Sequence, residues 1–242
     1  MFIACARFQS CWRMDESVPL VVPEVNPEDV KRHKGIIANP NCSTIQAVVA
    51  LKPLHDRYRI KRIIFSTYQS VSGAATAGWA DLENGLRGEP PKTFPFPILH
   101  NCIPQIDSFT ESGYTKEEIK MIEETKKIMH DDSLRITATT VRVPVFLSHS
   151  ESINVEFEKP FEFPELIETL RGGKGIIVQD DVSDKNAPYP MPIYAAGKDE
   201  VFVGRIRRDF SVDSGVNLWV VSDNTRKGAA LNAVQIAELL IK

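Results

Sequence analysis

The sequence lacks the long apolar runs and the charge imbalance that are typical of membrane-bound and nucleic-acid-binding proteins. No segment approaches the roughly 20 consecutive apolar residues that a membrane-spanning helix requires. The 29 Lys and Arg residues almost balance the 32 Asp and Glu residues, so that the net charge is only −3. Basic residues are also dispersed along the chain. We therefore expect neither a membrane nor a nucleic acid as a partner.

Cysteine and histidine are scarce as well, which argues against two further classes of protein. The four cysteines have no paired spacing and are too few for a disulfide scaffold, so we expect a reducing, cytoplasmic setting. The five histidines form no HxH or HExxH pattern, and we expect no metal site. The first 12 residues have no charged n-region and no long apolar core, so they are not interpreted as a signal peptide.

The rest of the chain reads as an α/β protein with one sizeable core. Residues 1–35 are rich in proline and are expected to form an irregular loop. Strands are expected at 60–68, 134–143, 151–158, 175–179, 201–207 and 216–221, the last two as an antiparallel pair. Helices are expected at 42–56, 74–84, 115–129, 162–170 and 223–241, with Thr115 and either Asp223 or Asn224 as N-caps.

Two segments between these elements have their own interpretation. The five prolines of 85–113 predict a long surface excursion, which is suited to an oligomer contact. The glycines at 172–175 follow a helix and precede a strand, the reverse of the order in a dinucleotide-binding turn. They are therefore interpreted as a helix-to-strand turn.

Cys42 lies between a short apolar run at 35–38, typical of the end of a buried strand, and a segment with helical periodicity. Ser43 or Thr44 is the expected N-cap, which places the thiol at the helix N-terminus. Unpaired N–H groups and the helix dipole favour an anion there, so we expect a lowered thiol pKa and donors for an oxyanion. The alternative is that Cys42 is a small buried hydrophobe.

Three polar residues are candidate partners of that cysteine. His149 lies in a turn between two strands, where a histidine taken alone is more often plain surface. Arg142 closes a strand and is either a solvated strand end or a bidentate clamp for a carboxylate. Gln69 stands at the C-terminal end of a strand, where ligand-handling residues gather.

Five blocks of sequence together resemble the aspartate-semialdehyde dehydrogenase family. They are 39–46 (NPNCSTIQ), 68–73 (YQSVSG), 101–107 (NCIPQID), 142–151 (RVPVFLSHSE) and 223–235 (DNTRKGAALNAVQ). The resemblance runs from about Arg13 to Lys242. It implies a substrate domain of the glyceraldehyde-3-phosphate-dehydrogenase type with a remnant of a Rossmann domain. By this resemblance, 1–41 is that remnant with an irregular N-terminus, 42–222 the catalytic and dimerisation domain, and 223–242 a helix that packs on the nucleotide-binding domain.

The resemblance also implies the chemistry. The family reduces L-aspartyl-4-phosphate to L-aspartate 4-semialdehyde with NADPH, through a cysteine thioester, in the synthesis of lysine, methionine and threonine. Cys42 matches its nucleophile, His149 its general acid and base, and Gln69 the residue that orients the substrate. The implied partners are aspartyl phosphate, inorganic phosphate and further copies of the chain, in a homodimer or homotetramer.

The remaining site residues are implied in the same way. The positions that match substrate contacts in the family are Arg142 for the aspartyl carboxylate, Glu124 for the amino group, Lys127 for phosphate and Asn41 for the oxyanion or phosphate pocket. Since Glu124 and Lys127 are three residues apart on one helix, both are expected to point into one pocket. Ser72, Gly73 and Asn224 match positions at the nicotinamide end of NADP.

One part of the family pattern is missing from this sequence. No Rossmann half with its Gly-rich fingerprint precedes Cys42, and the N-terminal arginine that binds phosphate in the family is also judged absent. We therefore expect weak NADP binding and little or no activity from this chain alone. Two alternatives stay open: a cofactor-free cysteine acyl-transferase or hydrolase, and a non-catalytic partner of full-length subunits.

Overall fold

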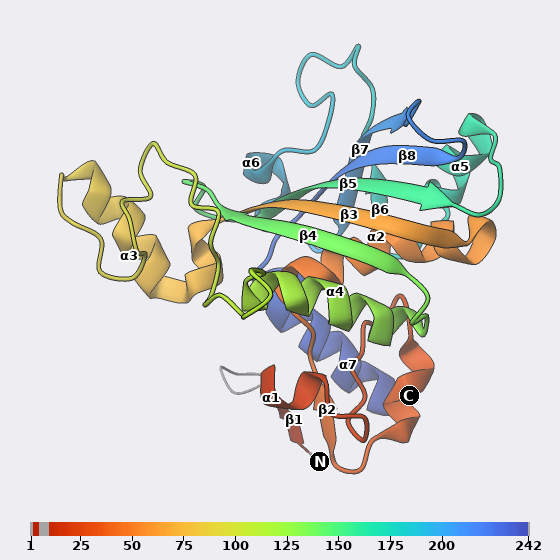
Figure 1. Cartoon of the computed structure of the whole chain (residues 1–242), viewed down its shortest axis with the longest axis horizontal. Helices are drawn as coiled ribbons and strands as arrows, with labels where there is room; N and C mark the ends of the chain where they lie inside the picture. The colour runs from red at the N-terminus through yellow and green to blue at the C-terminus, as the bar shows by residue number, and fades with distance from the viewer. Residues whose placement is uncertain (1, 5–9, 242) are drawn as a thin grey trace.

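The computed structural model describes residues 2–4 and 10–241 of the chain. Expectations for Met1 and for residues 5–9, including Cys5, lie outside the described residues. The described chain forms a large mixed sheet with helices on one face, an arm at one end of that sheet, and a small unit below the helices (Figure 1). This is the α/β architecture that the sequence predicts.

The large sheet has six strands in the order β4-β3-β5-β8-β7-β6. Its strands are β3 (Ile60–Gln69), β4 (Arg135–Arg142), β5 (His149–Phe157), β6 (Ile176–Val178), β7 (Val201–Arg208) and β8 (Gly215–Ser222). Strand β3 is parallel to β4 and antiparallel to β5. Strands β7 and β8 are antiparallel, as their alternating pattern predicts.

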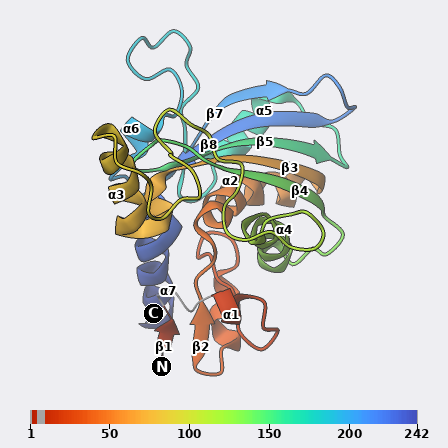
Figure 2. The ribbon, with the colours of Figure 1, turned by 60° about the vertical axis from the view of Figure 1, so that its left-hand side comes forward.

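Helices α2 (Cys42–Tyr58), α4 (Lys116–Met129) and α5 (Phe163–Arg171) cover one face of this sheet (Figure 2). Alternate residues of β3, such as Ile63 and Phe65, are fully buried against them. These three helices do not cover the opposite face of the sheet. That face holds the tilted ring pair of Tyr68 and Trp219, with centroids 5.5 Å apart. The period-2 pattern therefore leaves one face packed and one half exposed.

Local capping explains where these helices begin and end. Thr115 forms a full capping box with Glu118 at the start of α4, as predicted. Gly172 caps the C-terminus of α5, and Gly175, with φ +72°, turns the chain into β6. The prediction of a helix-to-strand turn for these glycines is therefore confirmed.

A small unit below the helices combines the N-terminal segment with the C-terminal helix (Figures 1 and 2). Its elements are β1 (Phe2–Ala4), α1 (Ser10–Arg13), η1 (Pro27–Arg32), β2 (Ile36–Ala38), η3 (Arg226–Ala230) and α7 (Leu231–Ile241). Strands β1 and β2 are parallel, and Val21, Val30, Ile37 and Ile236 form a separate core. The prediction of an irregular loop over 1–35 is therefore wrong for much of the described part of that segment.

The start of the last helix also differs from the prediction. It begins with the wider turn η3, and Thr225 occupies the N-cap position without a side-chain cap. The carboxylate of Asp223 nevertheless accepts the main-chain N–H groups of Thr225 and Arg226. Further along, Lys227 is buried and its Nζ donates to Glu24, Asn232 and Gln235, which ties the last helix to the N-terminal segment.

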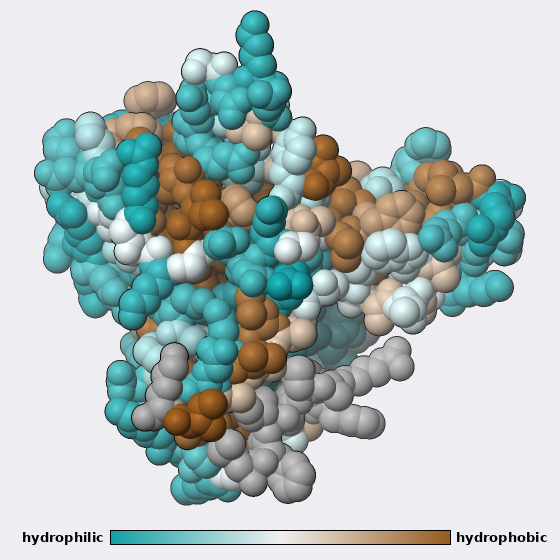
Figure 3. All heavy atoms as spheres, turned by 180° about the vertical axis from the view of Figure 1, so that it is seen from behind, coloured by the Kyte–Doolittle hydropathy of each residue, from teal (hydrophilic) through white to brown (hydrophobic). Residues whose placement is uncertain are grey.

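The arm consists of η2 (Val71–Ala74), α3 (Ala75–Leu86) and the long loop that follows. The carboxylate of Asp81 accepts the main-chain N–H groups of Lys92, Thr93 and Phe94, which closes the loop onto α3. Seen from behind, the arm projects to the right and shows hydrophobic side chains among polar ones (Figure 3). The predicted excursion is thus an ordered extension. The short helix α6 (Pro192–Ala195) lies at the base of another loop, which rises above the sheet.

Candidate active site

The topology of the large sheet brings the candidate residues to one edge. Because β3 and β4 are parallel, Gln69 and Arg142 are register partners at their shared C-terminal end. Strand β5 runs the opposite way and therefore starts at this edge with His149. Strand β2 leads into α2, which begins at Cys42. Four segments that are distant in sequence thus converge here.

The central contact of this edge joins Cys42 to His149. The Sγ atom lies 3.2 Å from Nε2 of the imidazole. His149 is fully buried, so the interpretation of this residue as plain surface is wrong. Cys42 as a whole residue is partly exposed. A thiol within reach of an imidazole is the arrangement of a cysteine nucleophile and its base.

The cap of α2 is Asn41 and not Ser43 or Thr44 as predicted. Its Oδ1 accepts the main-chain N–H groups of both these residues, at 3.0 and 3.2 Å. Cys42 therefore occupies the first helical position. The Nδ2 group of Asn41 donates to Glu117, at 2.8 Å, so the side chain of Asn41 is committed to the protein itself.

The protonation states in this structure differ from the sequence-based expectation of an acidic thiol. Burial, with a further contribution from Glu117, raises the pKa of Cys42 to about 12, although Arg142 and Arg13 act in the opposite direction. Burial and then Arg142 hold the pKa of His149 well below its ordinary value. The resting pair is therefore a neutral thiol beside a neutral imidazole.

Arg142 and Gln69 both point inward at this edge. Arg142 is buried, and its Nη1 donates to the main-chain oxygen of Ser70 at 2.7 Å, so it is not a solvated strand end. Its guanidinium lies over the ring of Phe94, 5.6 Å from the centroid. Gln69 is buried and its Nε2 donates to Glu117 at 3.3 Å. Both side chains are held in place before any ligand arrives.

Glu117 and Lys120 of α4 belong to this cluster, although they are not among the site residues predicted from the sequence. Glu117 is buried, and its Oε1 accepts from Asn41 and Gln69. The Nζ group of Lys120 lies 3.4 Å from the other carboxylate oxygen of Glu117 and 2.9 Å from Asp107. Burial opposes the charge of Lys120, but these two carboxylates prevail and raise its pKa.

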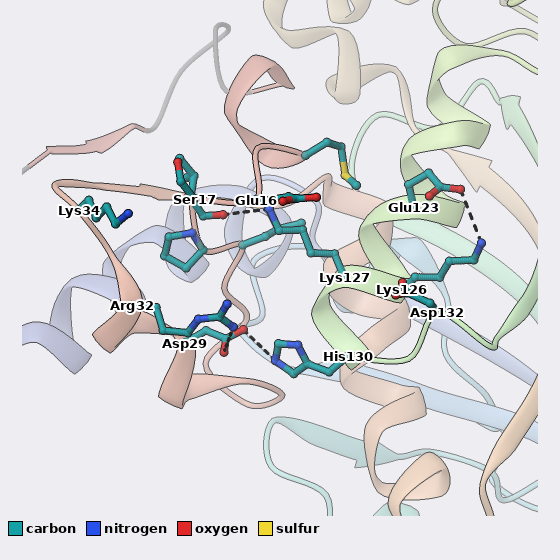
Figure 4. Close-up of a pocket in the computed structure, with 14 residues that line it drawn as sticks. Glu16, Ser17, Asp29, Arg32, Lys34, Glu123, Lys126, Lys127, His130 and Asp132 are labelled. Atoms are coloured by element: carbon teal, nitrogen blue, oxygen red, sulfur yellow. Dashed lines mark hydrogen bonds and ion pairs between the residues drawn. The ribbon is translucent and has the colours of Figure 1, made fainter.

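Glu124 and Lys127 do not open into a common pocket as expected. Glu124 accepts the main-chain N–H of Asn41 at 2.6 Å and Arg13 Nη1 at 3.1 Å. The Nζ group of Lys127 donates to three main-chain oxygens, those of Arg13, Asp15 and Val18. Lys127 also lines a separate polar depression of about 790 Å³ between α4 and the N-terminal segment (Figure 4). Both side chains are therefore used to hold the N-terminal segment in place.

Arg13 corrects the expectation that no N-terminal arginine reaches this site. Its Nε donates to the main-chain oxygen of Asn39 at 3.0 Å, and its Nη1 pairs with Glu124. Its charge lowers the pKa of Cys42, which places the guanidinium within electrostatic reach of the sulfur. The cluster thus has two cations within electrostatic reach of the thiol, Arg13 and Arg142.

The three residues expected at the cofactor lie behind the imidazole. Ser72 Oγ donates to Asn224 Oδ1 at 3.1 Å. A Cβ atom on Gly73 would lie 2.6 Å from Arg142 Nη1 and 3.2 Å from His149 Cε1, so only glycine fits this position without a shift. A mainly apolar depression of about 520 Å³ begins at Ser72 and runs along α3, with Trp79 and Leu147 among its lining residues.

Two further features are absent from the described residues. None of the helices there is both long and apolar enough to cross a membrane. The same residues contain no group of three or more His, Cys, Asp or Glu side chains arranged to hold a metal ion.

Comparison with known proteins gives the family. Residues 51–227 match the model described as "Semialdehyde dehydrogenase, dimerisation domain". The chain is 58% identical to the aspartate-semialdehyde dehydrogenase of Aquifex aeolicus, over 96% of this chain and 71% of that protein. The chain belongs to the aspartate-semialdehyde dehydrogenase family. It is therefore related to oxidoreductases of amino-acid biosynthesis.

Solved aspartate-semialdehyde dehydrogenases share this fold. A Vibrio cholerae aspartate-semialdehyde dehydrogenase II complexed with ASA is 51% identical, with a TM-score of 0.90, over 96% of this chain and 70% of that one. The Candida albicans enzyme with NADP is 27% identical, with a TM-score of 0.71, over 99% of this chain and 70% of that one. The chain thus spans about 70% of the length of these relatives.

Proposed function

We propose that the chain catalyses the NADPH-dependent reductive dephosphorylation of L-aspartyl-4-phosphate to L-aspartate 4-semialdehyde. The observation that supports this most directly is the 3.2 Å contact between Cys42 Sγ and His149 Nε2, flanked by Arg142 and Glu117. The product would enter the synthesis of lysine, methionine and threonine. The ASA complex of a close relative supports the substrate class.

Cys42 is the nucleophile in this proposal. Its thiol proton passes to His149 Nε2 as the sulfur attacks the acyl phosphate carbonyl; the new C–S bond forms and phosphate leaves with the electron pair of the broken C–O bond. Because the thiol is neutral at rest, ionisation and attack are coupled, and His149 is the nearby base for that proton. The resulting thioester is more electrophilic than an ester or amide and is suited to reduction.

The substrate contacts in this proposal follow the geometry. Arg142 would bind the carboxylate, since a guanidinium has donors beyond the one used on Ser70. Glu117, in place of Glu124, would bind the amino group. Gln69, which contacts Glu117, would orient the reacting carbonyl.

Two cations would receive the phosphate. Lys120, in place of Lys127, belongs to the cluster through its contact with Glu117. Arg13, whose charge acts on Cys42, would be the second cation. Asn41 would act mainly by holding α2 and Glu117 together, because its side-chain groups are already engaged.

The residues behind the imidazole fit the nicotinamide end of NADP. The depression beside Ser72 is mainly apolar and large enough for a flat ring. Ser72, Gly73 and Asn224 would hold the group there. When bound, NADPH would supply a hydride for the thioester carbonyl. The Candida albicans relative with NADP supports this cofactor.

We further propose that copies of the chain associate as a homodimer or homotetramer through the half-exposed face of the large sheet. The matched family model is a dimerisation domain, and this face carries the ring pair of Tyr68 and Trp219. We also propose that the chain is organised as a nucleotide-binding remnant at 1–41, a catalytic and dimerisation domain at 42–222, and a C-terminal helix at 223–242. The tie from Lys227 to Glu24 supports placing the C-terminal helix with the N-terminal segment.

One kinetic experiment tests the proposed reaction against a cofactor-free hydrolase. Aspartyl phosphate is mixed with the purified chain, with and without NADPH, and phosphate release and NADPH oxidation are followed together. We expect a burst of phosphate without NADPH, and only slow NADPH oxidation at high NADPH concentration, because this chain is expected to bind the cofactor weakly. Neither signal is expected from Cys42→Ser. Continuous phosphate release without NADPH oxidation would select the hydrolase instead.

A further inference from the structure

Gly228, in the turn that opens the last helix, packs directly on Cys42. It is buried, and a Cβ atom on it would lie 3.1 Å from Cys42 Cβ, 3.3 Å from the main-chain oxygen of Cys42 and 3.4 Å from its Cα. The two shorter distances are tighter than ordinary van der Waals contact. The main chain of η3 therefore lies so close to Cys42 that any side chain at position 228 would force one of them to shift.

The wide turn of η3 brings Gly228 into this contact. Its main-chain hydrogen bonds span five residues, since the N–H of Gly228 donates to the oxygen of Asp223 and that of Ala230 to the oxygen of Thr225, both at 3.1 Å. Turns of this π type are rare and are found frequently at functional sites. Here the widened main chain is the part of the segment that lies against Cys42.

The same segment also holds the residue three positions before Cys42. Asn232 Nδ2 donates to Asn39 Oδ1 at 2.7 Å and to the main-chain oxygen of Val21 at 3.0 Å. Asn39 Nδ2 in turn donates to the main-chain oxygen of Ala229 at 3.3 Å. Asn39 and Asn232 are both buried. Both polar atoms of the Asn39 side chain are therefore bound by the last helical segment.

The orientation of the Asn232 amide is fixed by Lys227. An ammonium group can only donate, and Lys227 Nζ lies 3.0 Å from Asn232 Oδ1. The amide oxygen therefore faces Lys227, and the amide nitrogen faces Asn39. The hydrogen bond to Asn39 Oδ1 consequently has its donor on Asn232.

The link from Asn39 to Cys42 is short and stiff. The ring of Pro40 fixes its own φ and restricts the residue before it to extended conformations. Asn41 then caps α2 through its side chain, and Cys42 is the first residue of that helix. A displacement of Asn39 is therefore transmitted to Cys42.

We propose that Gly228 and Asn232 are positioning residues that fix Cys42 against His149, Gly228 by direct contact and Asn232 through Asn39. Both act on the main chain around Cys42. The contact that they preserve is the 3.2 Å approach of Cys42 Sγ to His149 Nε2. The last helical segment thus contributes to the site as well as to the small unit. This inference rests on the Cys42–His149 pair of the proposed function.

The coupling between Cys42 and His149 tests the proposal without substrate or cofactor. Alkylation of Cys42 by iodoacetamide is followed by mass spectrometry of its own peptide, and the effect of His149→Gln on the rate is measured in each background. We expect His149→Gln to slow alkylation at least about tenfold in the unaltered chain, since the imidazole assists ionisation of the thiol. In Gly228→Ala and in Asn232→Ala the same replacement should slow it less than about threefold, because the thiol no longer meets the imidazole.

Two control variants separate positioning from a general loss of stability. A Cβ atom added at Gly172 makes only ordinary contacts, so Gly172→Ala is the control for Gly228→Ala. Glu24→Gln removes the charge that pairs with Lys227 and leaves the Asn232–Asn39 bond in place, so it is the control for Asn232→Ala. Both controls should keep the full effect of His149→Gln.

The possible results separate this proposal from the proposed function. A full effect of His149→Gln in either folded variant would overturn the positioning role, and Gly228→Ala decides alone if Asn232→Ala does not fold. No effect of His149→Gln in the unaltered chain would contradict the pair itself, and with it both proposals. A dehydrogenase assay that fails while the coupling is lost as expected would count against the proposed function alone.

Discussion

The carboxylate of Glu117 accepts a hydrogen bond from Asn41 Nδ2 at 2.8 Å, and this contact joins α4 to the residue that caps α2. The cap positions Cys42, so the charge of Glu117 is fixed close to the sulfur. The same carboxylate contacts Gln69 and Lys120. One side chain thereby links the helix cap, the end of β3 and a surface-facing cation.

This arrangement predicts different outcomes for two equivalent substitutions on α4. Glu117→Gln removes a charge from the proposed substrate pocket and should lower kcat/KM about 100-fold, with little change in thermal stability. It should also lower the pKa of Cys42, because Glu117 contributes to raising it. Steady-state kinetics and the pH dependence of Cys42 alkylation measure the two effects.

Glu124→Gln is the matched control for that prediction. Glu124 holds Arg13 and the main-chain N–H of Asn41, so its loss should reduce the melting temperature more than Glu117→Gln does. The opposite result would be a loss of activity in Glu124→Gln without a loss of stability, together with full activity in Glu117→Gln. It would show that Glu124, as implied by the sequence, binds the substrate amino group and that Glu117 does not.

Gly73→Ala should impair activity more than stability. The added Cβ would lie 2.6 Å from Arg142 Nη1 and 3.2 Å from His149 Cε1, so both side chains must move. We expect kcat/KM to fall at least about tenfold, since small displacements of catalytic groups have large effects on rate. Gly88→Ala is not a suitable control because its φ is +76°. A Cβ atom added at Gly172 would make only ordinary contacts, the nearest with the main-chain oxygen of Glu168 at 3.5 Å, and φ there is −77°. Gly172→Ala is therefore the control and should keep full activity.

Glu151 gives a prediction for stability against pH. Burial raises its pKa well above the ordinary value, although Gln46 acts in the opposite direction. The folded chain therefore binds this proton more tightly than the unfolded chain does. The stability it contributes is complete below the unfolded pKa, near 4.5, and is lost as pH rises towards the folded pKa, at roughly 1.4 kcal/mol per pH unit.

The substitution Glu151→Gln should remove this dependence. Its advantage in free energy of unfolding over the unaltered chain should grow between about pH 5 and pH 7, measured by urea denaturation at each pH. Glu158→Gln, at an exposed position just beyond β5, should show no such trend. Parallel curves for the Glu151 variant and the unaltered chain would show that the carboxyl is not protonated in the fold.

Lys227 should be the strongest single anchor of the C-terminal helix. Its buried Nζ donates to Glu24 at 2.5 Å, to Gln235 at 2.7 Å and to Asn232 at 3.0 Å. Lys227→Met leaves three acceptors without a donor, one of them a carboxylate, and should cost about 3 kcal/mol. Lys198→Met removes an exposed charge and should cost under about 0.5 kcal/mol. A loss below about 1 kcal/mol in Lys227→Met would contradict this account.

The order of the large elements could be predicted from the sequence because their patterns are long and regular. The strands and helices around Cys42, Arg142 and His149 have clear periodicity, and the family motifs include the two residues that meet at 3.2 Å. The short elements before Ile36 could not be predicted, because segments of three to six residues are too short to show a periodicity.

The error on α4 has a geometric cause. Glu117 and Lys120 have the same spacing as Glu124 and Lys127, and the two pairs are seven residues apart. Seven residues are close to two helical turns, so both pairs lie on nearly the same face. Spacing alone cannot decide between them. The pair that reaches the site is set by its position along α4 relative to the edge of the sheet. This position is known only from the fold.

The protonation of Cys42 could not be predicted for a similar reason. Position at a helix N-terminus predicts an acidic thiol, but burial and the neighbouring Glu117 outweigh that effect. Neither can be inferred from the sequence around Cys42. The resemblance likewise implies a pocket role for Asn41, whereas in the structure its side chain caps α2.

The most direct test of the account is to detect acyl transfer to Cys42. The purified chain is incubated with aspartyl phosphate without NADPH, quenched in acid, and the Cys42 peptide is analysed by mass spectrometry. The account predicts one aspartyl group on Cys42 in the unaltered chain, much slower labelling in His149→Gln, and none in Cys42→Ser. An unmodified Cys42 peptide under conditions in which phosphate is released would contradict it.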